Sequence, residues 1–185
     1  LSQVVSAAHK GRMLSLWQNS LEGPDVLPFR SRDGSVLLIY DGYVHGDCPV
    51  QAHCVFQAYK HHGLSFASHL EGEFGVVLLD LLQNRLLLAT DTLGTRPLFY
   101  ATDPLDRTAF SVATSQHSLA ALATSGWQQH QVPANRVLQF ELPHPGAEAG
   151  PISHLVTEFE FGRRHKHHTR DWEEAFQHAV EVAAS

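Results

Sequence analysis

The sequence has few of the features that mark a membrane, disulfide-rich or nucleic-acid-binding protein. Its 185 residues include only 2 cysteines and 1 methionine, and no apolar run approaches the ~20 residues that span a bilayer. Lysine and arginine number 13 against 19 acidic residues, so the net charge is -6 and no basic stripe is present for phosphate contacts. We therefore expect one globular domain that binds neither nucleic acid nor a membrane.

The two cysteines are too few for a disulfide framework or a zinc site. We interpret Cys48 and Cys54 as small apolar fillers in a reducing compartment. The first residues also lack the basic region and the apolar stretch of a signal peptide. The sequence therefore predicts a cytoplasmic protein. Because the chain begins with Leu1 rather than methionine, we expect further sequence upstream.

Short apolar runs bounded by Gly, Pro, Asn or Asp predict β-strands. Their nearly continuous apolar character indicates strands that are covered on both faces. They span residues 35–40, 74–80, 85–90, 98–101, 110–113 and 136–140. The four strands between residues 74 and 113 follow one another closely, so we predict a four-stranded meander with a hairpin at Gln83-Asn84.

Three helices are predicted from apolar periodicity and from start and stop signals. The first begins at Pro49 and ends at Gly63, which suits the position after a helix. The second covers residues 115–123, and the third begins at Asp171, which caps an amphipathic segment.

A basic stretch over residues 163–170 separates the last strand from the last helix. We interpret it as a junction between a domain over residues 1–160 and a linker with a helix over residues 161–185. Three histidines in this stretch could hold Zn or Ni weakly, namely His165, His167 and His168. The neighbouring arginines and lysine repel a cation, so we favour a solvated linker and predict no metal site.

The most specific pattern follows the first helix. Gly72 permits a turn, Asp91 ends a strand where it can accept hydrogen bonds from turn amides, and Gly94 allows a positive φ. Pro97 fixes the start of the next strand. From these properties alone we interpret Asp91 and Arg96 as a turn brace rather than a catalytic pair.

Several ordered motifs resemble the amino-terminal class II glutamine amidotransferase domain of the asparagine synthetase and β-lactam synthetase family. That family carries L-x-G-x-F-A-F-x-L-x-D and then L-x-x-R-D-x-x-G-x-x-P-L-Y-Y, where this chain has residues 70–80 and 87–100. Residues 112–119 are similar to its V-A-S-E-x-K-A-L, and residues 131–138 to its V-P-P-G-x-x-L. Residues 38–45 stand where the family has N-G-E-I-Y-N-H.

The resemblance implies an α+β fold, an Ntn-hydrolase-like αββα sandwich of two antiparallel sheets. In active members the first residue is a cysteine, whose thiolate attacks the glutamine amide while its own α-amino group acts as the base. Leu1 has no nucleophilic atom. The resemblance also implies ~40 further residues before Arg12, so the amino-terminal part of the fold is expected to precede this chain.

The glutamine-binding positions implied by the resemblance depart from the family pattern. Asp41 and Gly42 stand where the family has the Asn-Gly pair of the oxyanion hole, and a carboxylate there repels a developing oxyanion. Tyr43 replaces a glutamate and Thr90 replaces an arginine. The carboxylate that holds the glutamine α-amine falls at or near Gln51, which carries no charge. We therefore predict a vestigial glutamine site without a catalytic residue.

The predicted function is that of a degenerate glutaminase-like domain with a structural role, packed against an ATP-dependent amide- or lactam-forming synthetase domain or subunit. No Ser-Gly-Gly-x-Asp-Ser loop occurs in the sequence, so ATP and Mg²⁺ are expected only in that partner, and no cofactor in this chain. Two alternatives stay open: an active glutamine-dependent amidotransferase whose cysteine lies upstream, and a stand-alone scaffold that docks through residues 163–185. A homo-oligomer is also compatible with the sequence.

Overall fold

The structure is a computed structural model of the chain. It describes the backbone of residues 2–9, 12–19, 122 and 153–160, and it describes in full residues 28–46, 50–105, 110–121, 126–142 and 176–181. No helix in these ranges is long and apolar enough to cross a membrane.

Strands dominate the described part of the chain. They are β1 (Ser2–His9), β2 (Arg12–Asn19), β3 (Phe29–Arg30), β4 (Val36–Val44), β5 (Gly72–Asp80), β6 (Arg85–Thr90), β7 (Phe99–Thr102), β8 (Phe110–Ala113), β9 (Gln128–Gln131), β10 (Arg136–Glu141) and β11 (Ser153–Glu160). The helices are α1 (Gln51–His62), the 3-10 helix η1 (Gly63–His69) and α2 (Gln116–Leu122), and a further helical stretch covers 176–181.

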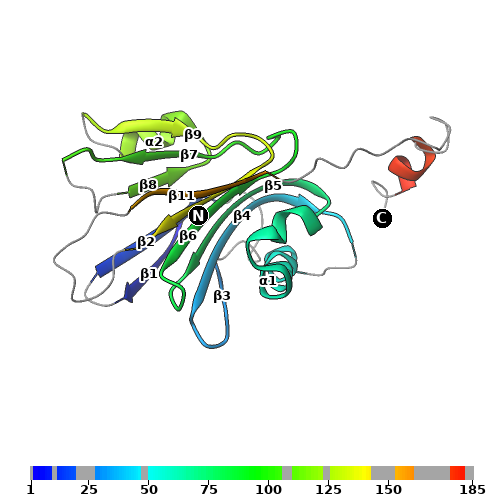
Figure 1. Ribbon diagram of the computed structural model, residues 1–185, viewed down its shortest axis with the longest axis horizontal. Coiled ribbons are helices and arrows are strands. Elements are labelled where there is room, and N and C mark those ends of the chain that lie inside the picture. Colours follow the sequence, from blue (N-terminus) through cyan, green and yellow to red (C-terminus); the bar gives the residue numbers. More distant parts are fainter. Residues whose placement is uncertain are drawn as a thin grey trace.

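The strands form antiparallel sheets. Six of them make a large sheet in the order β11-β10-β6-β5-β4-β3, three make a small sheet in the order β8-β7-β9, and β1 pairs with β2. Figure 1 shows α1 beside β4 of the large sheet, and α2 packs on β8 and β7 of the small sheet. Because neighbouring strands of the large sheet run in opposite directions, the end of β4, the start of β5, the end of β6 and the start of β10 share one end of that sheet.

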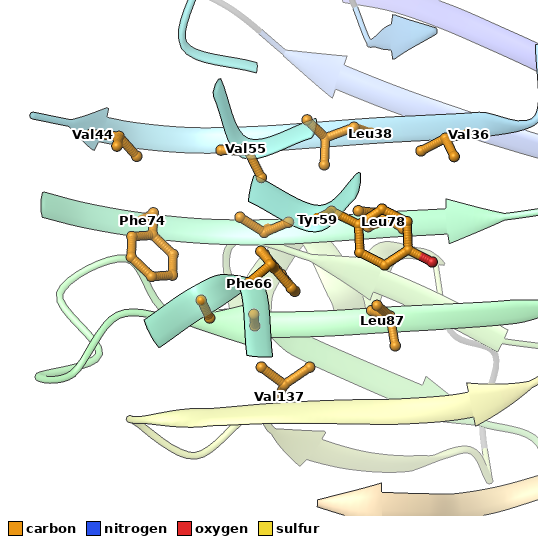
Figure 2. Close-up of a cluster of buried hydrophobic side chains, with 13 residues drawn as sticks. Val36, Leu38, Val44, Val55, Tyr59, Phe66, Phe74, Leu78, Leu87 and Val137 are labelled. Carbon is orange, nitrogen blue, oxygen red and sulfur yellow. The ribbon is translucent and has the colours of Figure 1, made fainter. Parts of the chain in front are cut away.

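Three clusters of buried apolar side chains lie between successive layers. The first joins α1 and η1 to the large sheet, and Figure 2 shows Val55, Tyr59 and Phe66 of these helices over the strands. The second fills the space between the two sheets and includes Leu79 of the large sheet and Leu98, which directly precedes β7. The third joins the small sheet to α2.

The large sheet is apolar on both faces because alternate residues of each strand point to opposite sides. In β5, Val76 and Leu78 enter the cluster under the helices, while Val77 and Leu79 enter the cluster between the sheets. The layers therefore follow the order helix, sheet, sheet, helix. The predicted α+β sandwich of two antiparallel sheets is confirmed.

The predicted strands are present, but the predicted four-stranded meander is wrong. β5 pairs with β6 and β7 pairs with β8, as expected for two hairpins. However, β6 continues to β10 of the large sheet, whereas β7 pairs with β9 of the small sheet. The chain changes sheets between Thr90 and Phe99, so the loop between them crosses from one layer to the other.

Elements with little apolar content escaped the sequence prediction. All four residues of β9 are exposed, so no apolar run marks this strand. The first helix begins at Gln51 rather than at Pro49. The second helix begins one residue later than expected, at Gln116. Residues 171–175 and the basic stretch 163–170, including its histidines, lie outside the described residues.

The interpretation of Cys54 as a reduced apolar filler is wrong. This cysteine, near the start of α1, is disulfide-bonded and partly buried. The other cysteine of the sequence, Cys48, lies outside the described residues. The sequence gave no signal for the bond at Cys54, because a disulfide depends on the directions of the two side chains that it joins.

Candidate functional site

The candidate site lies at the end of the large sheet where β4 ends and β5 begins. Gly42 and Gly72 have φ values of 122° and 143°, which side chains rarely adopt. A Cβ at Gly42 would overlap the carbonyl oxygen of Glu73, and a Cβ at Gly72 would overlap the carbonyl oxygen of Tyr43. The two glycines therefore let the strands approach closely at the position that the resemblance assigns to the oxyanion hole.

Gln51, the first residue of α1, fastens the helix to the end of β4. Its Oε1 accepts a hydrogen bond of 2.7 Å from the Val44 backbone N–H and one of 3.3 Å from the Tyr40 hydroxyl. Burial, and next the negative charge of Asp41, raise the pKa of Tyr40 well above its ordinary value, so this hydroxyl remains a donor. The amide side chain that stands at the predicted substrate-binding position thus serves as a clamp, which we call the Gln51 clamp.

Asp41 lies on the other side of the sheet from the Gln51 clamp. Side chains alternate between the two faces along β4, so Asp41 and Tyr40 point to opposite faces. Asp41 shares its face with Leu37, which enters the cluster between the sheets. Its cross-strand neighbour is Gly75, which has no side chain. Asp41 is partly buried.

Asp91 organises the loop that crosses between the sheets. Its carboxylate accepts hydrogen bonds from the backbone N–H groups of Phe74 (3.2 Å), Leu93 (2.9 Å), Thr95 (3.0 Å) and Arg96 (3.3 Å), and from the Thr95 hydroxyl (2.6 Å). Burial raises its pKa, but the hydrogen bonds from Thr95, Leu93 and Phe74 outweigh that effect and hold the pKa of Asp91 below its ordinary value. The side chain is an ionised brace with only 3% exposure.

Arg96 does not pair with Asp91 through its side chain. Its guanidinium lies 3.6 Å from the Glu73 carboxylate, and both side chains are largely exposed. Gly94 has the positive φ expected for the turn, 66°, and Pro97 lies between the turn and β7. A solvent-exposed ion pair of this kind contributes roughly 0–1 kcal/mol.

A second polar network lies toward the opposite end of the large sheet. The Tyr59 hydroxyl of α1 donates to Asp80 Oδ2 at 2.5 Å and accepts from Arg85 Nη2 at 2.6 Å. The Arg85 guanidinium also lies 5.4 Å from the centre of the Tyr59 ring. Figure 2 places Tyr59 and Leu78 toward one end of the cluster and Val44 and Phe74 toward the other. Sequence reasoning missed this network, because its members are far apart in the chain.

The structure therefore brings together some of the predicted positions and separates others. Gly42, Tyr43 and Gly72 meet at the junction of β4 and β5, and the Gln51 clamp reaches the same strand end. Within the described ranges, no three His, Cys, Asp or Glu side chains are close enough together to hold a metal ion. Tyr40 is the site residue that the sequence did not single out, although its place directly before Asp41 was a usable signal.

Comparison with known proteins supports the motif assignment. Residues 40–121 match a family model described as a glutamine amidotransferase domain. The chain is 35% identical over 105 residues to the amidase chyE of Penicillium rubens, a match that covers 47% of this chain and 15% of that protein. It is 27% identical over 90 residues to asparagine synthetase [glutamine-hydrolyzing] 2 of Bacillus subtilis, covering 40% of this chain and 12% of that protein.

The fold agrees with a solved amidotransferase. The structure of glutamine phosphoribosylpyrophosphate amidotransferase from B. subtilis, complexed with ADP and GMP, aligns with a TM-score of 0.52 and 15% sequence identity, over 75% of this chain and 32% of that one. The chain thus spans a small part of the length of the relatives that it matches. The resemblance to a glutamine amidotransferase domain is confirmed, and the sandwich fold agrees with that of the solved amidotransferase.

Proposed function

We propose that this glutamine amidotransferase-like domain, related to that of asparagine synthetase, no longer hydrolyses glutamine and has a structural role. The observation that carries the proposal is the Gln51 clamp. The position assigned to a substrate-binding carboxylate holds a neutral amide, and its oxygen already accepts from Val44 and Tyr40. A neutral group cannot supply the charge that pairs with the α-ammonium of glutamine.

The second support is Asp41. Hydrolysis of an amide builds negative charge on the carbonyl oxygen, and an oxyanion hole stabilises it with hydrogen-bond donors. An ionised carboxylate accepts hydrogen bonds and donates none, and its negative charge opposes the oxyanion. Asp41 and Gln51 thus each lack a property that glutamine turnover needs, although they lie on opposite faces of the large sheet near the end of β4.

We further propose that the domain packs against an ATP-dependent amide- or lactam-forming domain or subunit in the cytoplasm. ATP and Mg²⁺ would bind there and not to this chain. The exposed apolar side chains of residues 176–181 support such packing, since Phe176 is 64% exposed and Val180 is 51% exposed, one helical turn apart. Exposed apolar side chains in one stripe of a helix are typical of a surface that another domain covers.

An active glutamine-dependent enzyme is the second candidate, because the asparagine synthetase that this chain matches is named as glutamine-hydrolysing. Under that alternative a cysteine supplied from outside this sequence would attack the amide. The two candidates make opposite predictions for glutamine binding at the positions described above.

Glutamine binding distinguishes them. We expect no saturable shift of the Val44 or Gly42 amide signals in nuclear magnetic resonance spectra at about 10 mM glutamine, roughly tenfold above the usual range of enzyme KM values. The double variant Asp41→Asn/Gln51→Glu keeps the oxygen of the Gln51 clamp while it restores a carboxylate and an amide. Binding by this variant and not by the natural sequence would locate the loss at these two positions. Saturable binding by the natural sequence would contradict the proposal.

A further inference from the structure

Two histidine rings stack face to face between the end of α1 and the end of η1. His62 is the last residue of α1, and His69 is the last residue of η1. Their ring centres lie 3.6 Å apart, and their planes are 4° from parallel. Both side chains are exposed, so either ring can exchange protons with the solvent. The stack thus ties the carboxyl end of α1 to the carboxyl end of η1.

Hydrogen bonds fix which nitrogen of His69 takes up a proton. Its Nδ1 lies 3.1 Å from the carbonyl oxygen of Ser65 and 3.1 Å from Ser68 Oγ. The carbonyl oxygen can only accept, and Ser68 Oγ donates its own hydrogen to that same carbonyl at 2.7 Å. Nδ1 of the neutral ring therefore carries the hydrogen, and Nε2 accepts a further proton. Protonation charges the ring without breaking these bonds.

η1 is packed at its centre and held more weakly at its end. Phe66 is fully buried in the cluster under α1, and Figure 2 shows it over the strands of the large sheet. The last turn is held by the bonds of His69 and by the Leu70 N–H, which donates to the Ala67 carbonyl at 3.3 Å. Gly72 then begins β5. A change at His69 therefore acts on the connection into β5 before it acts on the core.

We propose that the stack of His62 and His69 is a proton-operated latch on the connection from η1 to β5. The latch is closed while at least one ring is neutral, because a neutral imidazole stacks on another ring or on a single imidazolium. It opens when both rings are protonated, because like charges then lie 3.6 Å apart. Opening releases the last turn of η1 and leaves Phe66 packed. Acid thereby loosens the strand end that carries Gly72, whether or not the domain turns glutamine over.

The groups around the stack favour opening in acid. His61 and Lys60 make the last turn of α1 basic. Burial, followed by the positive charges of His69 and His61, lowers the pKa of His62. By linkage, a contact that lowers the pKa of a ring weakens when that ring takes up a proton, so the closed latch is lost as the pH falls below the ordinary histidine pKa of 6.5. The ionisable side chains on the sheet face under α1 and η1 bind other residues of that layer, namely Tyr40, Asp80 and Arg85.

Nuclear magnetic resonance of the whole chain tests the latch directly. At about pH 7.5 the ring protons of His62 and His69 should show a mutual nuclear Overhauser effect and the upfield shifts of a stacked pair. Both signals should disappear once the two rings are protonated, at about pH 5 or below. The protection of the Leu70 amide against hydrogen exchange, relative to its intrinsic rate at each pH, should fall about threefold to fivefold. The protection of the Val77 amide in β5, the internal control, should change by less than about twofold.

Three variants separate stacking from charge. His69→Phe keeps a ring that stacks but takes up no proton, so Leu70 should keep its higher protection at both pH values. His69→Gln has no ring, so the protection of Leu70 should be low at both. His61→Gln is the matched control, because the His61 ring centre lies 6.3 Å from that of His62 and the two rings are not stacked. This control should keep the acid response.

A nuclear Overhauser effect between the rings that persists when both are protonated would overturn the proposal, and so would its absence at neutral pH. A fall in Leu70 protection that also occurs in His69→Phe would assign the acid response to another group and overturn it as well. An equal fall at Leu70 and Val77 would have the same consequence, because acid would then destabilise the whole sheet rather than the latch.

Discussion

Removing the Asp91 carboxylate tests the most connected polar group of the site. Asp91→Ala would leave the donors on Phe74, Leu93, Thr95 and Arg96 without their acceptor, at a position that is 3% exposed. A hydrogen bond to a charged group contributes about 1.5–3 kcal/mol, and the exposed part of the loop can recover some of the loss from water. We therefore expect a loss of about 3 kcal/mol in the free energy of unfolding.

Asp91→Asn separates charge from shape. Oδ1 accepts from Leu93 and Thr95, and Oδ2 accepts from Phe74, Thr95 and Arg96, so either orientation of the amide sets its NH₂ group against a backbone N–H. We expect this variant to lose about 2 kcal/mol despite its nearly identical size.

Urea unfolding followed by tryptophan fluorescence measures both losses. The matched control is Asp33→Asn, because Asp33 also accepts three hydrogen bonds from neighbouring residues but is exposed. The control should lose much less stability than the Asp91 variants. A loss below about 1 kcal/mol for Asp91→Ala would refute the interpretation of Asp91 as a buried brace.

The pH dependence has a defined sign. The pKa of Asp91 is lower in the folded chain than in the unfolded chain. Its contribution to the free energy of unfolding is therefore present when the pH is above the unfolded-state pKa, and it disappears as the pH falls through the folded-state pKa. The stability gap between the natural sequence and Asp91→Asn should therefore shrink below about pH 4. A gap that stays constant from neutral pH into that range would show that the carboxylate does not act through its charge.

Three further predictions follow from other contacts. Tyr59→Phe should lose about 1–2 kcal/mol in urea unfolding, because its two charged partners lose the hydroxyl that joins them. Gly42→Ala should lose more stability than Gly46→Ala, measured in the same way, because both have a positive φ but only Gly42 has backbone within reach of a new Cβ. Burial, and then the positive charges of His69 and His61, lower the pKa of His62, so His69→Gln should raise the His62 pKa in a nuclear magnetic resonance titration. A stability loss for Gly42→Ala that is no larger than that for Gly46→Ala, or an unchanged His62 pKa in His69→Gln, would contradict these predictions.

The sequence predicted those parts of the fold that depend on local apolar pattern. The runs around Leu78 and Leu87 are apolar at every position, and both strands are indeed covered on two faces. The apolar pattern could not show that β6 and β7 belong to different sheets, because the same residues would be buried if the two strands were paired in one sheet. β9 was missed because none of its residues is buried, and its place in the sheet is fixed by pairing with β7.

The site was predictable to the extent that it depends on neighbours in the chain. The spacing of Asp91 and Gly94 indicated a turn brace, and the structure has the carboxylate on the turn amides. The contact of Gln51 with Val44 could not be predicted, because it depends on where α1 starts and how the helix packs on the sheet. The disulfide at Cys54 required the same spatial information.

The most direct test of the central claim is glutamine turnover by the protein as its natural gene encodes it. Ammonia and glutamate release should stay at the rate of a buffer control, and a thiol-directed glutamine analogue should leave no covalent adduct. Release of ammonia above that background, abolished by the analogue, would contradict the account and assign the domain a working glutaminase site.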